Sequence, residues 1–99
     1  MEKIRTVASR KYYSLSCHRF FVFKGHKEYE QSLVIIITNE GGSISFTFTD
    51  LATNKVIEFK DPKTGEYIIP LTKGGKTKLV ITASHAIGSY NIKKKTIKG

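Results

Sequence analysis

The sequence predicts an all-β domain, in the form of an antiparallel two-sheet β-sandwich of the jelly-roll or immunoglobulin-like kind. Apolar and polar residues alternate along short runs, most clearly over residues 43–49. A period of two places one face of a strand in a core and the other face in water. Gly, Asp, Asn and Pro interrupt these runs about every 8–12 residues, which indicates about seven or eight strands. A small barrel is the alternative to the two-sheet sandwich. No segment places its apolar residues at helical spacing.

The length of 99 residues suits a single domain, which we expect to span residues 1–99. A chain of this size can bury a core without cross-links, and the one cysteine, Cys17, has no partner for an internal disulfide. No apolar run is long enough to cross a membrane as a helix. With no recognisable signal peptide, a cytoplasmic location is expected if the chain is complete as given.

The N-terminal segment has the least regular pattern. Residues 4–7 and 12–15 are each expected to form a short strand, although neither alternates clearly. Residues 20–23, Phe-Phe-Val-Phe, are apolar at both parities. We therefore expect this strand to be covered on both faces, or to lie under a loop. A turn is expected at residues 25–27.

Residues 33–49 are predicted to form a β-hairpin. The first strand, residues 33–38, is rich in β-branched side chains, which favour a strand over a helix. Asn-Glu-Gly-Gly at residues 39–42 resembles a tight turn, because glycine supplies the positive φ that such turns require. Residues 43–49 then return as the second strand.

Two further turns punctuate the middle of the chain. An Asp begins the turn at residues 50–54, where its side chain can accept bonds from nearby backbone amides. A strand over residues 55–59 leads to the second turn, Asp-Pro-Lys-Thr-Gly at residues 61–65. The next strand, residues 66–71, contains Pro70, which lacks an N–H and should lie at a sheet edge.

The C-terminal part is predicted to form a second hairpin. After a turn at residues 72–76, residues 77–83 alternate as a strand, residues 85–88 turn, and residues 89–95 return. Lys94 shares the inward parity of the last strand, so the strand is expected to bulge or leave the core there. Between the two sheets we expect five core side chains: Ile44, Phe46, Phe48, Leu79 and Ile81.

The net charge of +9 is unevenly distributed. Residues 3–27 and 72–99 contain no acidic residue, and residues 29–54 contain no Lys or Arg. Such asymmetry is compatible with an anionic partner, but the interpretation we favour is that lysines on exposed strands increase solubility and block edge-to-edge aggregation. If residues 77–83 and 89–95 pair as a hairpin, they bring together a candidate anion- or partner-binding cluster: Lys73, Lys76, Lys78, Lys93, Lys94 and Lys95.

Catalytic and metal-binding signatures are not apparent, and we expect no enzymatic activity, no metal site and no cofactor. The three histidines, His18, His26 and His85, are scattered. Cys17 and His18 are adjacent, so in a strand they would project to opposite faces, which does not suit a nucleophile and its base. No nucleophile elbow, phosphate-binding loop or dinucleotide fingerprint occurs.

Cations and aromatics interleave at residues 10–13, Arg-Lys-Tyr-Tyr, and at residues 19–21, Arg-Phe-Phe. On an exposed sheet these side chains could follow phosphates and stack on bases. The alternative interpretation, which we favour, is that Phe20, Phe21 and Phe23 belong to the core.

The order of strands and turns from residue 21 onward resembles a known family. An aromatic strand ending in Lys-Gly is followed by a long aliphatic strand, a Gly-Gly turn, Ser-Ile-Ser-Phe-Thr-Phe-Thr-Asp, Ile-Pro-Leu-Thr-Lys-Gly-Gly and Gly-Ser-Tyr-Asn-Ile. This pattern, over residues 18–97, resembles the bacterial pre-peptidase C-terminal type of β-sandwich module. A second resemblance, carried by residues 49–67, is to prealbumin-like modules of surface adhesins. The first family often binds calcium through acidic loops, and this chain, with few acids, departs from it there.

Both resemblances imply a non-catalytic bacterial accessory or cell-surface module that contacts protein or polysaccharide, in an extracellular location. The alternative is a stand-alone basic protein that binds nucleic acid, or a phage-type inhibitor. In either case we expect a monomer or a weak homo-oligomer.

Overall fold

The computed structural model describes residues 2–97, and in this range the chain is all β, with no helix. Every strand pairing is antiparallel, which confirms the predicted class. The strands are β1 (Glu2–Lys24), β2 (Glu30–Asp50), β3 (Val56–Lys60), β4 (Gly65–Leu71) and β5 (Lys76–Ile97). They form one sheet in the order β1-β5-β2-β3, and β4 also pairs with β2.

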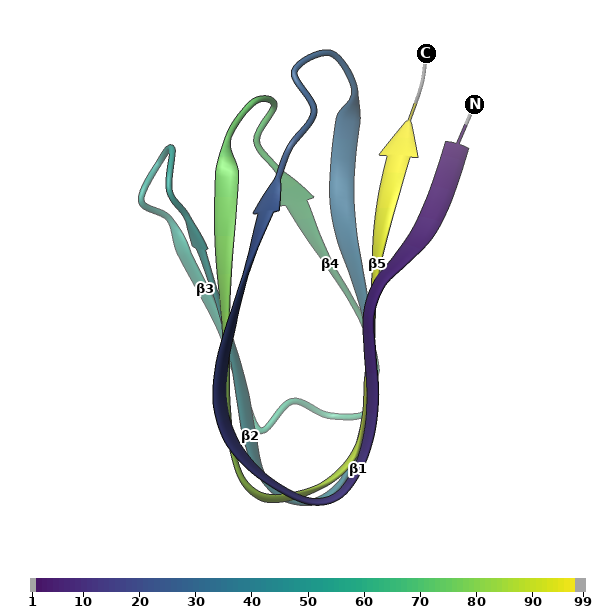
Figure 1. Ribbon diagram of the computed structural model, residues 1–99, viewed down its shortest axis with the longest axis vertical. Coiled ribbons are helices and arrows are strands. Elements are labelled where there is room, and N and C mark those ends of the chain that lie inside the picture. The colour runs from purple at the N-terminus through teal and green to yellow at the C-terminus, as the bar shows by residue number, and fades with distance from the viewer. Residues whose placement is uncertain (1, 98–99) are drawn as a thin grey trace.

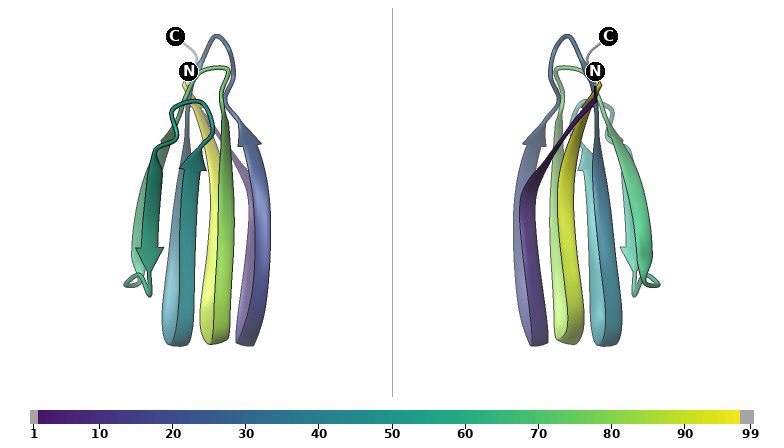
Figure 2. Two further views of the ribbon diagram at one scale, coloured as in Figure 1. Left: turned by 90° about the vertical axis from the view of Figure 1, so that its left-hand side faces the viewer. Right: turned by 90° about the vertical axis from the view of Figure 1, so that its right-hand side faces the viewer.

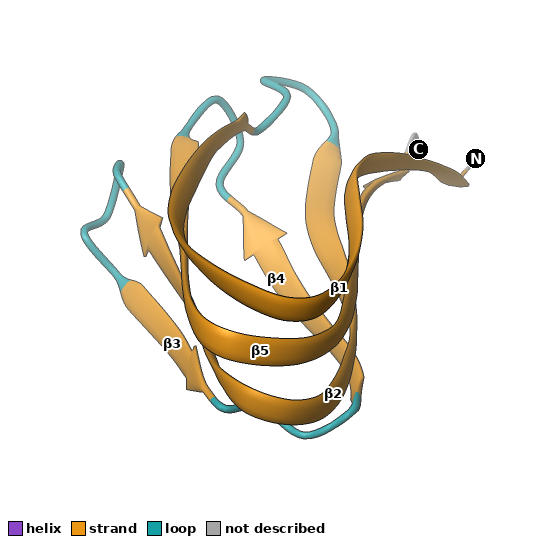
Figure 3. Cartoon of the chain, turned by 60° about the horizontal axis from the view of Figure 1, so that its bottom comes forward, coloured by secondary structure: helices purple, strands orange, loops and turns teal. Residues whose placement is uncertain are grey.

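The three long strands bend together, so that the sheet folds into a U (Figure 1). Seen from the closed side, β1, β5 and β2 curve side by side around the bend (Figure 3). We call the first wall the part in which β4 pairs with residues 31–37 of β2, and the second wall the part in which β3 pairs with residues 45–49. The beginning of β1 and the end of β5 lie at the open end of the U, opposite the bend.

One bent sheet therefore takes the place of the two separate sheets that the sequence predicted, and five strands take the place of seven or eight. Each long strand passes through both walls, and the two halves of β2 and of β5 correspond to runs that the sequence predicted as separate strands. β1 lies at one edge of both walls, while β3 and β4 lie at the opposite edges (Figure 2).

Both predicted hairpins are wrong. Residues 33–38 and 43–49 are successive parts of β2, and both pair with β5. Residues 77–83 and 89–95 are likewise successive parts of β5. The intervening glycine-containing segments carry register shifts that curl the strand without reversing it.

Two glycines are required at the bend. Gly42 has φ 72° and Gly88 has φ 147°, a range that L side chains rarely adopt. A Cβ on Gly42 would overlap the carbonyl oxygen of His85, and one on Gly88 would overlap the carbonyl oxygen of Thr38. The bend therefore needs glycine both for backbone conformation and for close approach of the strands.

The core lies between the two walls. The five predicted core side chains are all buried, which confirms their inward orientation. Phe46 in the second wall packs edge-to-face on Tyr90 in the first wall, with ring centroids 6.0 Å apart. β4 adds Ile69 and Leu71 to the same core, and Pro70 between them is exposed on this edge strand, as predicted.

The N-terminal segment is one continuous strand. The two short strands predicted at residues 4–7 and 12–15 are parts of β1. Over residues 20–23, Phe21 packs against the core and Phe23 is buried. Phe20 and Val22, however, are 65% and 52% exposed, so the expectation of cover on both faces is wrong for the outer face.

The predicted turns at residues 50–54, 61–65 and 72–76 separate strands as expected. The connection from β3 to β4 crosses between the walls (Figure 1). Its Asp61 carboxylate accepts a 2.9 Å bond from the backbone N–H of Ile44. This contact anchors the crossing to β2 near the bend.

Candidate functional site

The six predicted lysines do not form one patch. Lys93, Lys94 and Lys95 lie near the end of β5, in the first wall. Lys76 and Lys78 lie at its beginning, in the second wall, and Lys73 lies in the preceding turn. The U brings both ends of β5 to the open end (Figure 1), but successive side chains point to opposite faces of a strand. The predicted cluster is therefore wrong in its hairpin geometry, and of its members Lys94 alone lines the inner side of the open end.

Lys94 spans the gap between the walls. In register it pairs with Arg5 on one side and Leu33 on the other, so β5 does not bulge at this residue. Its Nζ donates a 2.7 Å hydrogen bond to the backbone carbonyl of Lys24, at the end of β1 in the opposite wall. The inward parity of Lys94 is thus accommodated because the strand has left the apolar core and reached the polar open end.

Two adjoining hollows flank Lys94. The first, of about 280 Å³, is lined by Lys3, Arg5, His26, Tyr29, Gln31, Lys94 and Thr96. The second, of about 370 Å³, is lined by Lys24, Gly25, His26, Lys27, Glu28, Gln31 and Lys94. We call their cations, Lys3, Arg5, Lys24, Lys27 and Lys94, the basic mouth. The first hollow has three of these cations and no carboxylate in its lining.

Hydrogen bonds hold the floor of the basic mouth in place. The Gln31 side chain accepts a 2.7 Å bond from the N–H of His26 and donates a 2.9 Å bond to Thr96 Oγ1. His26 Nδ1 accepts from the N–H of Glu28 at 3.0 Å, and the His26 and Tyr29 rings lie 4.6 Å apart. The loop of residues 25–29 is therefore tied to β2 through Gln31, and Gln31 in turn links β2 to β5.

Two like charges are neighbours in the basic mouth, since Arg5 and Lys94 are paired across β1 and β5. Partial burial, and then the positive charge of Arg5, lower the pKa of Lys94 from its ordinary value. The ion pair found among residues 2–97 joins Lys95 Nζ and Glu2 Oε2, which are 3.5 Å apart. Neither residue lines the first hollow. A bound anion between Arg5 and Lys94 would relieve their repulsion, so the arrangement suits a negatively charged ligand.

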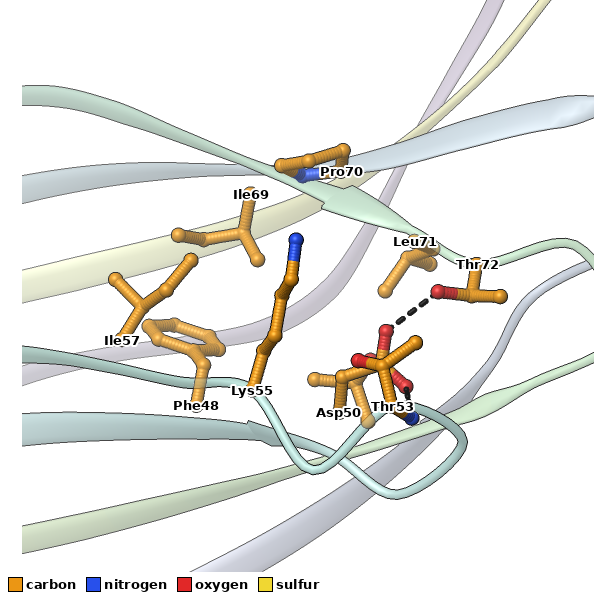
Figure 4. A pocket seen from close by; sticks show the side chains of 10 residues that line it. Phe48, Asp50, Thr53, Lys55, Ile57, Ile69, Pro70, Leu71 and Thr72 are labelled. Carbon is orange, nitrogen blue, oxygen red and sulfur yellow. Dashed lines mark hydrogen bonds between the residues drawn. The ribbon is translucent and has the colours of Figure 1, made fainter.

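A third hollow, of about 200 Å³, lies between β3 and β4 (Figure 4). Apolar side chains, including Phe48, Ile57 and Ile69, line it. Its carboxylate, Asp50, accepts bonds from Thr72 Oγ1 and from the N–H of Ala52, and the first of these contributes most to lowering the pKa of Asp50. Asp50 is thus engaged in joining β2 to the end of β4.

The chemistry-bearing residues named from the sequence are dispersed. Cys17 is half-buried, and His18 is exposed with its Nδ1 3.2 Å from Thr82 Oγ1, so the two project to opposite faces as expected. Within residues 2–97, His, Cys, Asp and Glu form no group of three that could hold a metal ion. The described chain also contains no helix long and apolar enough to cross a membrane.

The cation–aromatic segments are divided between core and surface. Tyr12 is buried, whereas Tyr13 is 73% exposed, with Lys11 Nζ 5.6 Å from its ring centroid. Phe20 is also exposed, with Lys78 Nζ 5.3 Å from its ring centroid. The favoured interpretation that all three phenylalanines of residues 20–23 are core is therefore wrong for Phe20.

Sequence reasoning missed most of the basic mouth. Lys3, Arg5, Lys24 and Lys27 come from an acid-free segment, and this signal was visible in the sequence. What was not visible is that β1 and the following loop meet Lys94, seventy residues after Lys24 in the chain, since this depends on the bend.

Comparisons with known proteins assign no family. No family model matches the chain, and no curated protein matches it. Among solved structures, the P-domain of Macrobrachium rosenbergii nodavirus is similar, with a TM-score of 0.41 and 11% sequence identity, over 95% of this chain and 90% of that chain. This likeness is too weak to support a functional assignment.

Proposed function

We propose that this protein is a non-catalytic binding module that holds an anionic polysaccharide at the basic mouth. The observation that supports the proposal is the hollow in which Lys3, Arg5 and Lys94 gather without a carboxylate. An anion placed there gains charge-assisted bonds and lowers the repulsion between Arg5 and Lys94. The two facing walls support a sandwich-like description, while the jelly-roll or immunoglobulin-like assignment and the pre-peptidase resemblance stay predictions.

The ring pair beside the cations favours a sugar polymer. His26 and Tyr29 line the first hollow, and Tyr29 is half-buried. Aromatic rings can pack against the apolar face of a sugar while neighbouring cations bind its sulfate or carboxylate groups. The mouth thus combines the two features that recognition of an acidic polysaccharide requires.

The test is calorimetric titration with dextran sulfate and with neutral dextran. We expect binding of dextran sulfate alone, with an affinity that falls as salt increases. The double variant Arg5→Gln, Lys94→Met should weaken it at least about tenfold, since two charged contacts are lost. Lys60→Gln is the matched control, because Lys60 ends β3 and lies outside the lining of either basic hollow. An equal loss in both variants would show nonspecific attraction to the net charge and overturn the assignment of the site.

Binding of single-stranded nucleic acid is a second candidate, favoured by the exposed rings of Tyr13 and Phe20, each with a lysine nearby. Exposed aromatics beside cations can stack on bases while the cations contact phosphates. A gel shift with an oligonucleotide at low and high salt tests it. We expect a shift that weakens steeply with salt and on Tyr13→Ala, and no shift at low salt would exclude this candidate.

A further inference from the structure

One edge of β1 is unpartnered. Among residues 2–97, β1 pairs with β5 alone and ends the strand order of the sheet. The other edge of such a strand carries backbone N–H and C=O groups that can pair with an added strand. Register shifts interrupt the first part of β1, but none occurs from Cys17 to Lys24. This segment therefore has the regular geometry that strand addition needs.

The outer face of the same segment is apolar and uncovered. Phe20 and Val22 occupy alternate positions and so share this face, and both are exposed. The Cβ atoms of residues directly opposite one another on neighbouring strands lie about 4.5–5.5 Å apart. An added strand with apolar side chains on this face would thus cover Phe20 and Val22 while its backbone completes the edge.

The charge around this edge specifies the partner. Residues 3–27 contain no acidic residue, and Arg19 and Lys24 lie within the free segment. Lys78 of the neighbouring strand lies beside Phe20. A second copy of this strand would set like charges against one another, and the net charge of +9 opposes self-association. An acidic strand would instead be attracted.

We propose that the Cys17–Lys24 edge of β1 binds an extended acidic segment of another protein by β-strand addition. The apolar side chains of the segment cover Phe20 and Val22 on the outer face, which Lys24 and Lys78 share by alternation and register. Its acidic side chains, at alternate positions, lie on the face of Arg19, which is their direct contact, and the two lysines attract them at longer range. Main-chain hydrogen bonds supply affinity, and the alternation of apolar and acidic residues supplies specificity. A nucleic acid would not complete the backbone edge, and Val22 offers it no ring for stacking.

The experiment uses an eight-residue peptide of alternating Glu and Val, followed by amide NMR shifts in the full chain. We expect shifts concentrated on residues 17–24, and at least about tenfold weaker binding by Phe20→Ala. Val56→Ala is the matched control, because Val56 is 60% exposed, close to the 65% of Phe20, but lies on β3 at the opposite edge of the second wall. A peptide methylated at alternate backbone nitrogens should not bind, because it cannot donate the ladder bonds.

Several outcomes would overturn this inference. The first is the absence of amide shifts at about 1 mM peptide. The second is that the methylated peptide, or a peptide that alternates Lys and Val, binds as tightly as the Glu-Val peptide. The third is that Val56→Ala weakens binding as much as Phe20→Ala. A dimer that sediments without peptide and dissociates on Phe20→Ala would make a second copy the occupant. Displacement of the peptide by a single-stranded oligonucleotide would point to nucleic acid. The single variant Arg5→Gln keeps the bond from Lys94 to the Lys24 carbonyl and should bind the peptide normally while its binding of dextran sulfate is weakened, so failure here and failure of the basic mouth are distinguishable.

Discussion

Lys94 and Lys24 join the two walls at the open end of the U, through a 2.7 Å hydrogen bond from the Lys94 ammonium group to the Lys24 carbonyl oxygen. The bond connects the end of β5 to the end of β1, far from the bend that joins the walls covalently. The same lysine lines both hollows of the basic mouth. A structural tie and a candidate ligand contact therefore depend on one side chain.

Replacing Lys94 by Met should change how stability depends on pH. The pKa of Lys94 in the folded protein is below its ordinary value of 10.5, because of partial burial and then of Arg5. The unfolded chain thus binds the Lys94 proton more tightly than the folded protein does. The contribution of Lys94 to the free energy of unfolding therefore rises as the pH increases through the lowered pKa toward 10.5. Urea unfolding between neutral pH and that value should show a steeper rise for the native sequence than for Lys94→Met. Identical slopes would contradict the assigned burial and repulsion.

Asp50→Asn should make the protein less sensitive to acid. The pKa of Asp50 is held below its ordinary value of 3.8, first by the hydrogen bond from Thr72 and then by that from the N–H of Ala52. A lowered folded pKa gives stability that is present above 3.8 and is lost as the pH falls through the folded value. Thermal unfolding at a series of acidic pH values should show a smaller fall in Tm for the variant, from a lower starting Tm. An unchanged acid profile would mean that Asp50 is not engaged as described.

Phe46→Ala should destabilise the fold by about 3–5 kcal/mol, because it removes a large side chain from a close-packed core. Phe46 is 0% exposed and contacts Tyr90 in the facing wall. Val56→Ala, on the exposed side of β3, should change stability by less than about 0.5 kcal/mol. Chemical denaturation of both variants makes the comparison. A near-neutral Phe46→Ala would place the core elsewhere.

Gly88→Ala tests the bend. Gly88 has φ 147°, and an added Cβ would overlap the carbonyl oxygen of Thr38. We expect a loss of at least about 2 kcal/mol, from backbone strain and from separation of β5 and β2. Gly65→Ala is the matched control, since the nearest atom to a Cβ there lies 4.0 Å away. If the two variants unfold at the same urea concentration, the bend does not depend on glycine at this position.

Alternation along the chain was enough to predict much of the local structure. The buried faces of β2 and β5, with Phe46 and Leu79 among their members, follow from the period of two. The turns at residues 50–54, 61–65 and 72–76 follow from Asp, Pro and Gly chemistry. These features depend on neighbouring residues, so the sequence by itself determined an all-β antiparallel chain and the orientation of most of its core.

The tertiary structure decided whether each glycine-containing segment reverses a strand or bends it. The segments at residues 39–42 and 85–88 are locally compatible with a hairpin turn, and β2 and β5 continue through both because each finds its pairing partner in the other along its whole length. That choice also decided the candidate site, since only the folded-over sheet brings Arg5, Lys24 and Lys94 to one opening. Long-range pairing energy selects among turns that local conformational preference leaves equivalent.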